Sequence, residues 1–208
     1  MRNVAQHSAI ATAIRTLAAE KSSACLLDAQ GTFLFVNEAW DRHALANGGA
    51  PSCLGASLIG THWLEHVRGD EVRESLADLL ARVLREPGPR PRALLQMGEC
   101  NTPTTSQLLS TRLEPVLHDG EAVAVRILHT VVRERPIAEV YDVVHRPLDS
   151  YRSEDGQVAQ CSCCRRMRDP VEPERWDLVP ALLAQPLAEA SQVLCGYCGE
   201  LHASKPAA

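Results

Sequence analysis

Two Cys-x-x-Cys motifs near the C-terminal end constrain what this chain can fold into more than any other feature. The first motif holds Cys161 and Cys164, and the second holds Cys195 and Cys198. Each motif offers two thiolates from one tight turn, and the segment between the motifs is long enough for the two pairs to converge on one ion. We therefore predict that these four cysteines bind Zn²⁺ in a small four-cysteine module of the zinc-ribbon type, spanning residues 158–208.

The expected chemistry of this zinc is structural. A closed set of four sulfur ligands leaves no coordination position for water, so the metal would stabilise the fold and catalyse nothing. Zinc with four thiolates carries a net negative charge that nearby donors or positive charges must offset. Arg165, Arg166 and Arg168 follow the first motif and are expected to do so. The alternative, that these arginines hold phosphate, fits less well because several acidic residues lie close by.

Two side chains beside the motifs leave alternatives open. Cys163 is either an inert thiol or one that exchanges into the site and releases zinc on oxidation. His202, four residues after Cys198, could replace a cysteine ligand if the end of the chain is helical.

Size and composition limit the rest of the chain. Its 208 residues, 45% of them hydrophobic, suffice for one domain of about 100 to 150 residues and a smaller annex. The first residues lack the roughly 7 to 15 apolar residues of a signal peptide, and no segment reaches the roughly 20 needed to cross a bilayer. A net charge of -5 argues against broad nucleic-acid binding. We therefore expect a cytoplasmic protein with reduced thiols, no membrane contact and no broad nucleic-acid binding, which leaves room for a local basic patch.

Residues 1–22 are predicted to form an amphipathic helix. Ile10, Ile14 and Leu17 recur at helical spacing, and the segment from Asn3 onward lacks Gly and Pro. The narrow apolar stripe fits two alternatives, which are packing on the helix's own domain and a contact between two copies of the chain.

Residues 23–134 carry strand and helix signals typical of an α+β domain. Asn37 is a candidate N-cap for a short helix that directs Trp40 and Leu45 inward. The side chains of the last strand alternate between a covered face and one that is wetter or covered by a partner. The predicted strands are Ala24–Asp28, Thr32–Val36, Arg92–Glu99, Ser106–Leu117 and Ala122–Val132, and two further helices are predicted at His62–Arg68 and Asp70–Arg85.

Four short stretches in this region together match the pattern of one known kind of domain. They are Leu27-Asp28-Ala29-Gln30-Gly31, Phe33 to Trp40, His118-Asp119-Gly120 and Val125 to His129. In this order they resemble the opening hairpin, first helix and closing hairpin of PAS sensor domains, over about Ala24 to Arg133. The resemblance implies a five-stranded antiparallel sheet with flanking helices. PAS domains often end in an Asp-Ile-Thr coupling motif, whereas this chain continues as Arg133-Glu134-Arg135-Pro136, so the direction of output stays open.

The PAS resemblance also implies a pocket for a small ligand that the sequence does not identify. The candidate lining residues are Trp40, His62, Trp63 and His66. His62 and His66 would share a helical face, near the place where haem-binding PAS domains carry their iron ligand. Haem is therefore one alternative, although a lone histidine more often serves as a core or surface residue. PAS domains that bind flavin covalently resemble one another in an Asn-Cys motif that this chain lacks.

Residues 135–157 are predicted to be a polar linker. A short helix is expected at Ile137–Val144, and the stretch Tyr151–Gly156 is expected to be exposed. A further helix, Trp176–Leu187, is expected to cover the metal site. The cysteine motifs with their flanks, over about Gln160–His202, resemble a short Cys-rich segment at the ends of bacterial sensor kinases and response-regulator-like proteins.

No known catalytic motif is present, so we expect no enzymatic activity. The leading hypothesis is a PAS-type signalling protein that senses a small ligand or redox state and relays it by protein–protein contacts. It would act as a homodimer formed through the N-terminal helix or the PAS sheet, or with a protein partner that the sequence does not identify. Two alternatives stay open: a transcriptional accessory protein whose zinc module contacts nucleic acid, and a thiol/zinc redox switch.

Overall fold

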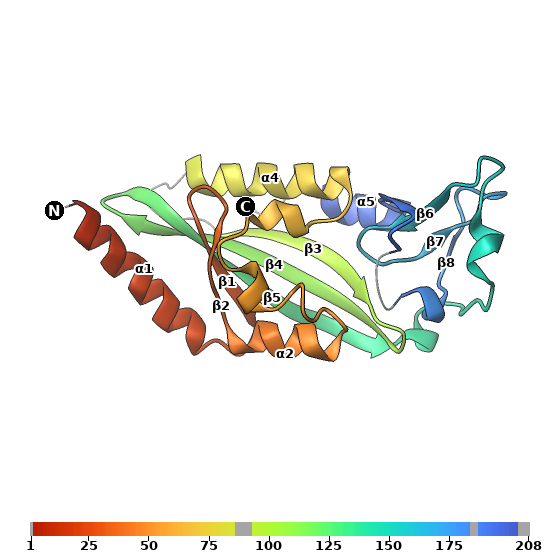
Figure 1. Cartoon of the computed structure of the whole chain (residues 1–208), viewed down its shortest axis with the longest axis horizontal. Helices are drawn as coiled ribbons and strands as arrows, with labels where there is room; N and C mark the ends of the chain where they lie inside the picture. Colours follow the sequence, from red (N-terminus) through yellow and green to blue (C-terminus); the bar gives the residue numbers. More distant parts are fainter. Residues whose placement is uncertain (1, 86–92, 184–186, 204–208) are drawn as a thin grey trace.

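A five-stranded antiparallel sheet forms the larger part of the computed structural model, which describes residues 2–85, 93–183 and 187–203 (Figure 1). The predicted α+β class with flanking helices is confirmed. The strands run in the order β2-β1-β5-β4-β3. Their bounds are β1 Ser23–Asp28, β2 Phe33–Val36, β3 Leu94–Asn101, β4 Thr105–His118 and β5 Glu121–Pro136.

Both faces of the sheet are covered, because alternate side chains of each strand point to opposite sides. Leu27 and Ile127 are fully buried on the face packed against α4 (Asp70–Arg85). Leu26 and Ala124 are fully buried on the other face, against α1 (Arg2–Ala18). The predicted N-terminal helix is thus confirmed, and it packs on its own domain. Each such leucine contributes about 1.5 to 3 kcal/mol by leaving water.

The helix α2 (Glu38–Ala46) is capped as predicted by Asn37, whose Oδ1 accepts a hydrogen bond from the backbone N of Trp40 at 3.0 Å. The predicted inward position of Leu45 is wrong, because this side chain is 61% exposed. The inner face of α2 runs through Trp40 and Ala44, which are four residues apart. Leu45 lies one residue further along the chain, about 100° around the helix.

The segment before β3 follows the prediction with one correction. Helix α4 has the predicted bounds, and its residues Val72, Leu79, Leu80 and Val83 are buried. A four-residue helix α3 (Gly55–Leu58) precedes it, and the helical piece predicted at His62–Arg68 shortens to a single 3-10 turn at Trp63–His66. The cause is local: Val67 is extended, and Gly69 has a φ of 80° that no right-handed helix contains.

Strands β3, β4 and β5 match the predicted strands at their centres and run longer at their ends. Strand β5 continues past the predicted end at Val132, because β4 pairs with it as far as Thr105 opposite Pro136. The predicted start at Arg92 lies outside the described residues. The extension carries the Thr105–Pro136 end of the paired strands β4 and β5 toward the part of the molecule where the cysteine motifs lie (Figure 1).

The cysteine motifs belong to a second, smaller sheet with the order β8-β7-β6-β9. Its strands are β6 Val158–Cys161, β7 Met167–Arg168, β8 Trp176–Asp177 and β9 Ala190–Val193. Strand β6 pairs with β9 in parallel, so that Cys161 lies opposite Val193. The chain then enters α5 (Gly196–Ala203). The parallel pairing brings the second motif beside the first.

The helix predicted at Trp176–Leu187 is wrong. Trp176 and Asp177 pair with β7 as a strand, Val179 is extended, and only a 3-10 turn at Pro180–Leu182 follows. Pro180 cannot donate a backbone hydrogen bond and can only begin a helical turn, so the apolar spacing here does not continue a helix. Residues 184–186 lie outside the described part of the chain.

The predicted linker also differs. The helix expected at Ile137–Val144 shortens to a 3-10 turn, Ile137–Glu139. Tyr151, expected to be exposed, is 1% exposed and packs with Val158, Met167 and Val179 in the core of the small sheet. Its aromatic ring supplies apolar area that a sheet of two- to four-residue strands could not supply alone.

The small sheet and α5 are here called the cysteine module, and its helix α5 lies against β3, the edge strand of the large sheet (Figure 1). The Gln96 amide donates to the carbonyl of Leu201 at 3.0 Å, and the Asn101 amide donates to the carbonyl of Cys164 at 3.1 Å. The backbone N of Leu194 donates to Glu71 on α4 at 3.3 Å. An exposed strand edge is a site for unwanted pairing, and these contacts place the module beside the β3 edge.

None of the helices in the described part of the chain combines the length and apolar character that a membrane span requires.

Candidate metal centre and adjoining cavity

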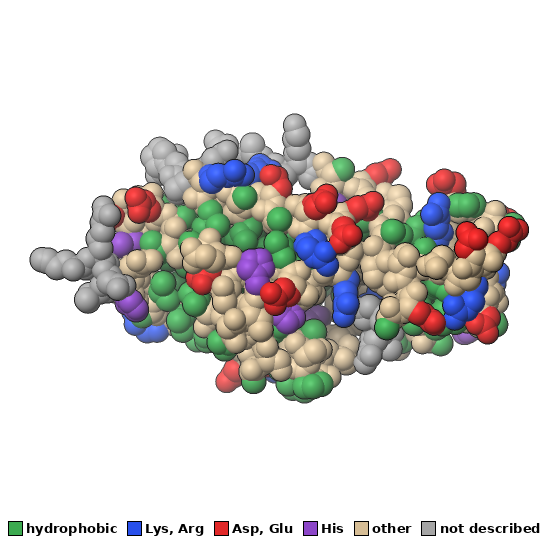
Figure 2. Space-filling model, turned by 45° about the horizontal axis from the view of Figure 1, so that its top comes forward, with side chains coloured by type: hydrophobic (Ala, Val, Ile, Leu, Met, Phe, Trp, Pro, Cys, Tyr) green, Lys and Arg blue, Asp and Glu red, His purple; other side chains and the backbone are tan. Residues whose placement is uncertain are grey.

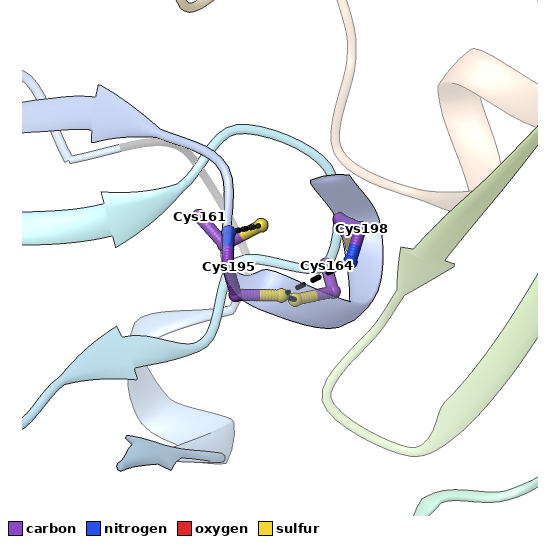
Figure 3. A group of neighbouring side chains, drawn as sticks. All are labelled: Cys161, Cys164, Cys195 and Cys198. Atoms are coloured by element: carbon purple, nitrogen blue, oxygen red, sulfur yellow. Dashed lines mark hydrogen bonds between the residues drawn. The ribbon is translucent and has the colours of Figure 1, made fainter. Parts of the chain in front are cut away.

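The four predicted cysteines meet (Figure 3). The sulfurs of Cys161, Cys164, Cys195 and Cys198 lie within 4.8 Å of one another, and all four residues are buried. The sulfurs of Cys164 and Cys195 are 3.7 Å apart. A tetrahedron with metal–sulfur bonds of about 2.3 Å has edges of about 3.8 Å, whereas a disulfide is about 2.05 Å long. The donor set and its spacing therefore fit a metal ion.

Backbone geometry holds the first motif in place. The backbone N of Cys161 donates to Arg166 O at 2.8 Å, and the backbone N of Arg165 donates to Cys161 O at 3.0 Å, which closes the turn. Arg165 takes a φ of 60°, a left-handed conformation that is uncommon for a residue with a side chain. In the second motif, the amides of Cys195 and Cys198 point at the sulfurs of Cys161 and Cys195, each at 3.5 Å. Such donors stabilise thiolates.

Of the three predicted arginines, Arg166 is the one that reaches the sulfurs. Its guanidinium donates from Nε to Cys164 at 3.2 Å and from Nη2 to Cys195 at 3.3 Å. Arg165 donates to the carbonyl of Leu183 at 2.6 Å, and Arg168 donates to the carbonyl of Pro173 at 2.9 Å. Charge compensation by direct contact is therefore the role of Arg166.

The clustered thiols share their protons unequally. Hydrogen bonds from Cys164, and then from Cys195 and Cys198, lower the pKa of Cys161. The same sharing, chiefly with Cys161, raises the pKa of Cys198. A first thiolate thus forms readily, while four thiolates together repel one another unless a cation joins them.

Cys163 stands outside this set of four. Its sulfur lies 3.2 Å from Nε2 of His202 on α5. A hydrogen bond from Cys198, and then the contact with His202, lower the pKa of Cys163 to about 6. His202 thus contacts Cys163 and is not one of the four clustered side chains.

Polar residues that no sequence pattern singles out join the centre to the large sheet. Nη2 of Arg166 lies 4.0 Å from Glu99 on β3, and its guanidinium stacks on the Tyr141 ring at 4.9 Å. Tyr141 and Ser106 both donate to Oε1 of Glu99. Glu99 is 5% exposed, and its other oxygen has no hydrogen-bond partner among the described residues. In the sequence, Glu99 is only a charged residue at the end of a predicted strand, which does not identify its partner.

A cavity of about 210 Å³ adjoins the centre. Trp40 and His43 of α2 and the following Asn47 line one side, His129 of β5 lines another, and Arg165 of the first cysteine turn also lines it. Trp40 is thus the one predicted pocket residue that lines this cavity.

The other predicted pocket residues lie elsewhere. Trp63 is 6% exposed within the main core. Nδ1 of His62 accepts from the backbone N of Leu64 at 3.3 Å and caps the 3-10 turn. Nε2 of His66 lies 2.7 Å from the Thr61 hydroxyl. Among the described residues, these three do not line the 210 Å³ cavity that Trp40 lines.

No model of a known protein family matches this chain, and no curated protein matches it. Among solved structures, the PAS domain of Bordetella pertussis BvgS is 14% identical with a TM-score of 0.48, covering 64% of this chain and 91% of that one. The Rhodobacter sphaeroides LOV protein is 15% identical with a TM-score of 0.42, covering 62% of this chain and 68% of that one. Drosophila melanogaster Cycle PAS-B is 17% identical with a TM-score of 0.38, covering 52% of this chain and 98% of that one.

Proposed function

We propose that this chain is a non-enzymatic signalling protein in which a four-cysteine zinc centre holds a small module against a PAS-like sheet. The observation that carries the proposal is the set of four buried sulfurs, with an edge of 3.7 Å and a guanidinium on two of them. Thiolates in this number and spacing suit zinc. The ion is structural, because four protein ligands fill its coordination sphere.

The relay would run through the contact between the module and β3. Arg166 contacts both the sulfurs and the Glu99–Tyr141 pair, and Asn101 holds the backbone of Cys164. A change in metal or ligand state that moves the first cysteine turn would therefore alter contacts on the sheet, which a second copy or a protein partner could read. The homodimer and the cytoplasmic location remain parts of this proposal.

The nucleic-acid alternative has less support. Figure 2 shows Lys and Arg side chains interspersed with Asp and Glu on the face in view, without a continuous basic track. Phosphate binding depends on accumulated positive charge. Arg146, which precedes the module in the chain, donates to Asp169, and Arg175 donates to Asp177, so these arginines are paired with carboxylates.

A redox switch is a second candidate, because Cys163 lies beside both His202 and the ligand set. Peroxide would oxidise the Cys163 thiolate to a sulfenic acid and be reduced to water. A ligand thiolate would then displace hydroxide to form a disulfide and release the metal. Zinc release by peroxide should be slower in Cys163→Ser than in Cys100→Ser, and equal rates would exclude the switch.

Metal analysis tests the main proposal. The purified chain should contain about one zinc per molecule, and Co²⁺ should replace it with the intense absorption of a tetrahedral thiolate site. Cys164→Ser combined with Cys195→Ser should abolish both signals, whereas Cys53→Ser, at an exposed thiol, should change neither. A chain that binds neither metal would refute the proposal.

A further inference from the structure

The cavity beside the metal centre is built from two units of the molecule. The central part of the inner sheet face is filled, since Phe33, Leu113 and Ile127 are at most 1% exposed. The cavity lies beyond this core, toward the cysteine module. Its walls come from α2 and the following loop, from the large sheet, and from Arg165 of the module. An occupant would therefore touch the sheet and the metal-bearing turn at once.

Aromatic groups with fixed positions form part of the wall. Nε1 of Trp40 donates to the carbonyl of Cys53 at 2.9 Å, which locks the indole. The rings of Trp40 and His129 meet edge to face, with centroids 5.4 Å apart. Nδ1 of His129 lies 2.9 Å from the Thr111 hydroxyl, which fixes the imidazole. This wall of two held rings suits a flat ring with a polar edge.

The polar groups around the cavity favour an uncharged occupant. Burial, and then repulsion by His43, lower the pKa of His129 to about 4, and burial lowers the pKa of His43. Both imidazoles are therefore neutral at pH 7. No carboxylate is among the described lining residues, so a cation finds no counter-charge here. The one cation among them, Arg165, has its guanidinium directed at the carbonyl of Leu183 at 2.6 Å, so it is not a dedicated partner for an anion.

The volume suits an occupant with one ring. A cavity of about 150 Å³ is enough for benzene. The 210 Å³ found here leaves room for a ring with one or two small substituents. Pockets for drug-sized ligands begin at about 300 Å³, and a haem macrocycle exceeds those ligands in size.

We propose that this cavity binds a small, uncharged, single-ring heteroaromatic molecule, and that binding is linked to the metal centre through Arg165. Arg165 is part of the turn that holds Cys164, and its guanidinium is fixed on the carbonyl of Leu183. A ligand that packs against Arg165 favours the ordered turn, so ligand and metal should each tighten the binding of the other by the same factor. The linkage rests on the proposed zinc site, whereas the ligand site does not.

The test of the ligand site uses 2-pyridone as the probe, with 2-quinolone as a two-ring homologue and benzoate as an anionic ring. Calorimetry on the zinc-loaded chain should find that 2-pyridone binds about tenfold or more tightly than either. Val131→Phe fills the cavity from a side chain that is 45% exposed and should weaken 2-pyridone about tenfold. Val132→Phe, at a neighbour that is 56% exposed and does not line the cavity, should leave the affinity unchanged.

The ligand site is refuted if 2-pyridone fails to bind, if the three probes bind alike, or if the two valine variants behave alike. The linkage is tested separately, by zinc affinity with and without saturating 2-pyridone. We expect about fivefold tighter zinc binding with the probe, and no effect of the probe in Arg165→Gln. If the zinc affinity is the same with and without 2-pyridone, the linkage is refuted. A chain that binds 2-pyridone but no zinc overturns the proposed function and leaves the ligand site standing.

Discussion

At the scale of single residues, Arg166 has the most specific role in the metal centre. It donates to two of the four sulfurs and lies against Glu99 and Tyr141 at the same time. Groups that hydrogen-bond to metal ligands commonly change metal affinity when they are replaced. The role is geometric, because Arg165 and Arg168 carry the same charge and donate to carbonyl oxygens instead.

Arg166→Gln should therefore lower zinc affinity about 10- to 100-fold, because it removes the positive charge and the paired donors. Competition with a chromophoric chelator measures this. Arg168→Gln is the matched control, since this exposed side chain donates to the Pro173 carbonyl. Equal affinities in the two variants would show that overall charge, and not contact with sulfur, is what matters.

His129 should make the stability of the chain depend on pH. Its pKa is about 4 in the folded chain and about 6.5 when unfolded, so the unfolded state takes up a proton first as the pH falls. The contribution is complete above about pH 6.5 and is lost as the pH falls toward about 4. Urea midpoints measured from about pH 7.5 to about pH 4.5 should decline less steeply in His129→Gln than in the parent chain. Parallel declines would contradict the neutral, buried imidazole.

What sequence predicts at this scale depends on how local the cause is. The cysteine spacing predicted which four thiols meet, because each Cys-x-x-Cys motif is a local pattern that brings its own two thiols together. Glu99 and Tyr141 lie 42 residues apart in the chain and share no pattern. Arg165 lies in the cavity wall because of the turn in which it takes a left-handed conformation. No distinctive sequence marks that turn, so the position of Arg165 was not predictable.

At the scale of secondary-structure elements, the side chain of Asn37 connects α1, β1 and α2. Its Oδ1 accepts from the backbone N of Ala24 and of Trp40, each at 3.0 Å. Its Nδ2 lies within hydrogen-bond distance of the carbonyls of Leu17, Glu20 and Ser22, from the end of α1 to the start of β1. One amide, 2% exposed, therefore fixes α1, β1 and α2 relative to one another.

Asn37→Asp should destabilise the chain by about 2 to 4 kcal/mol. The substitution keeps an oxygen for the helix cap but places a carboxylate oxygen against three buried carbonyls. Urea unfolding followed by circular dichroism measures the loss. Asn47→Asp, at a partly exposed amide near the end of α2, should cost no more than about 1 kcal/mol. Similar costs at both positions would rule out the joining role of Asn37.

Helices with a sustained apolar period were predictable, and those of the cysteine region were not. In α4 the apolar residues recur along the whole helix with no interruption, so period and burial agree. Around Trp176 a similar spacing is interrupted by Pro180, and the strand pairing with β7 prevails. The cap at Asn37 was predictable because it depends on neighbours in sequence.

At the scale of the whole molecule, the cysteine module lies against β3, the edge strand of the large sheet. Its contacts reach β3 through Gln96, Glu99 and Asn101, and α4 through Glu71. Such long-range contacts have no period and no fixed spacing, so the sequence predicted two units without predicting how they meet. The docking matters because it places the metal centre, the cavity and the sheet edge in one connected region.

The central claim is that the metal orders the module and, through it, the edge of the sheet. Hydrogen exchange of the full chain, loaded with zinc and after chelation, tests it most directly. We predict that chelation speeds exchange in residues 158–203 and in β3, while β1 and the buried part of β5 stay protected. Unchanged protection of the module after chelation, or a change that stops short of β3, would contradict the claim.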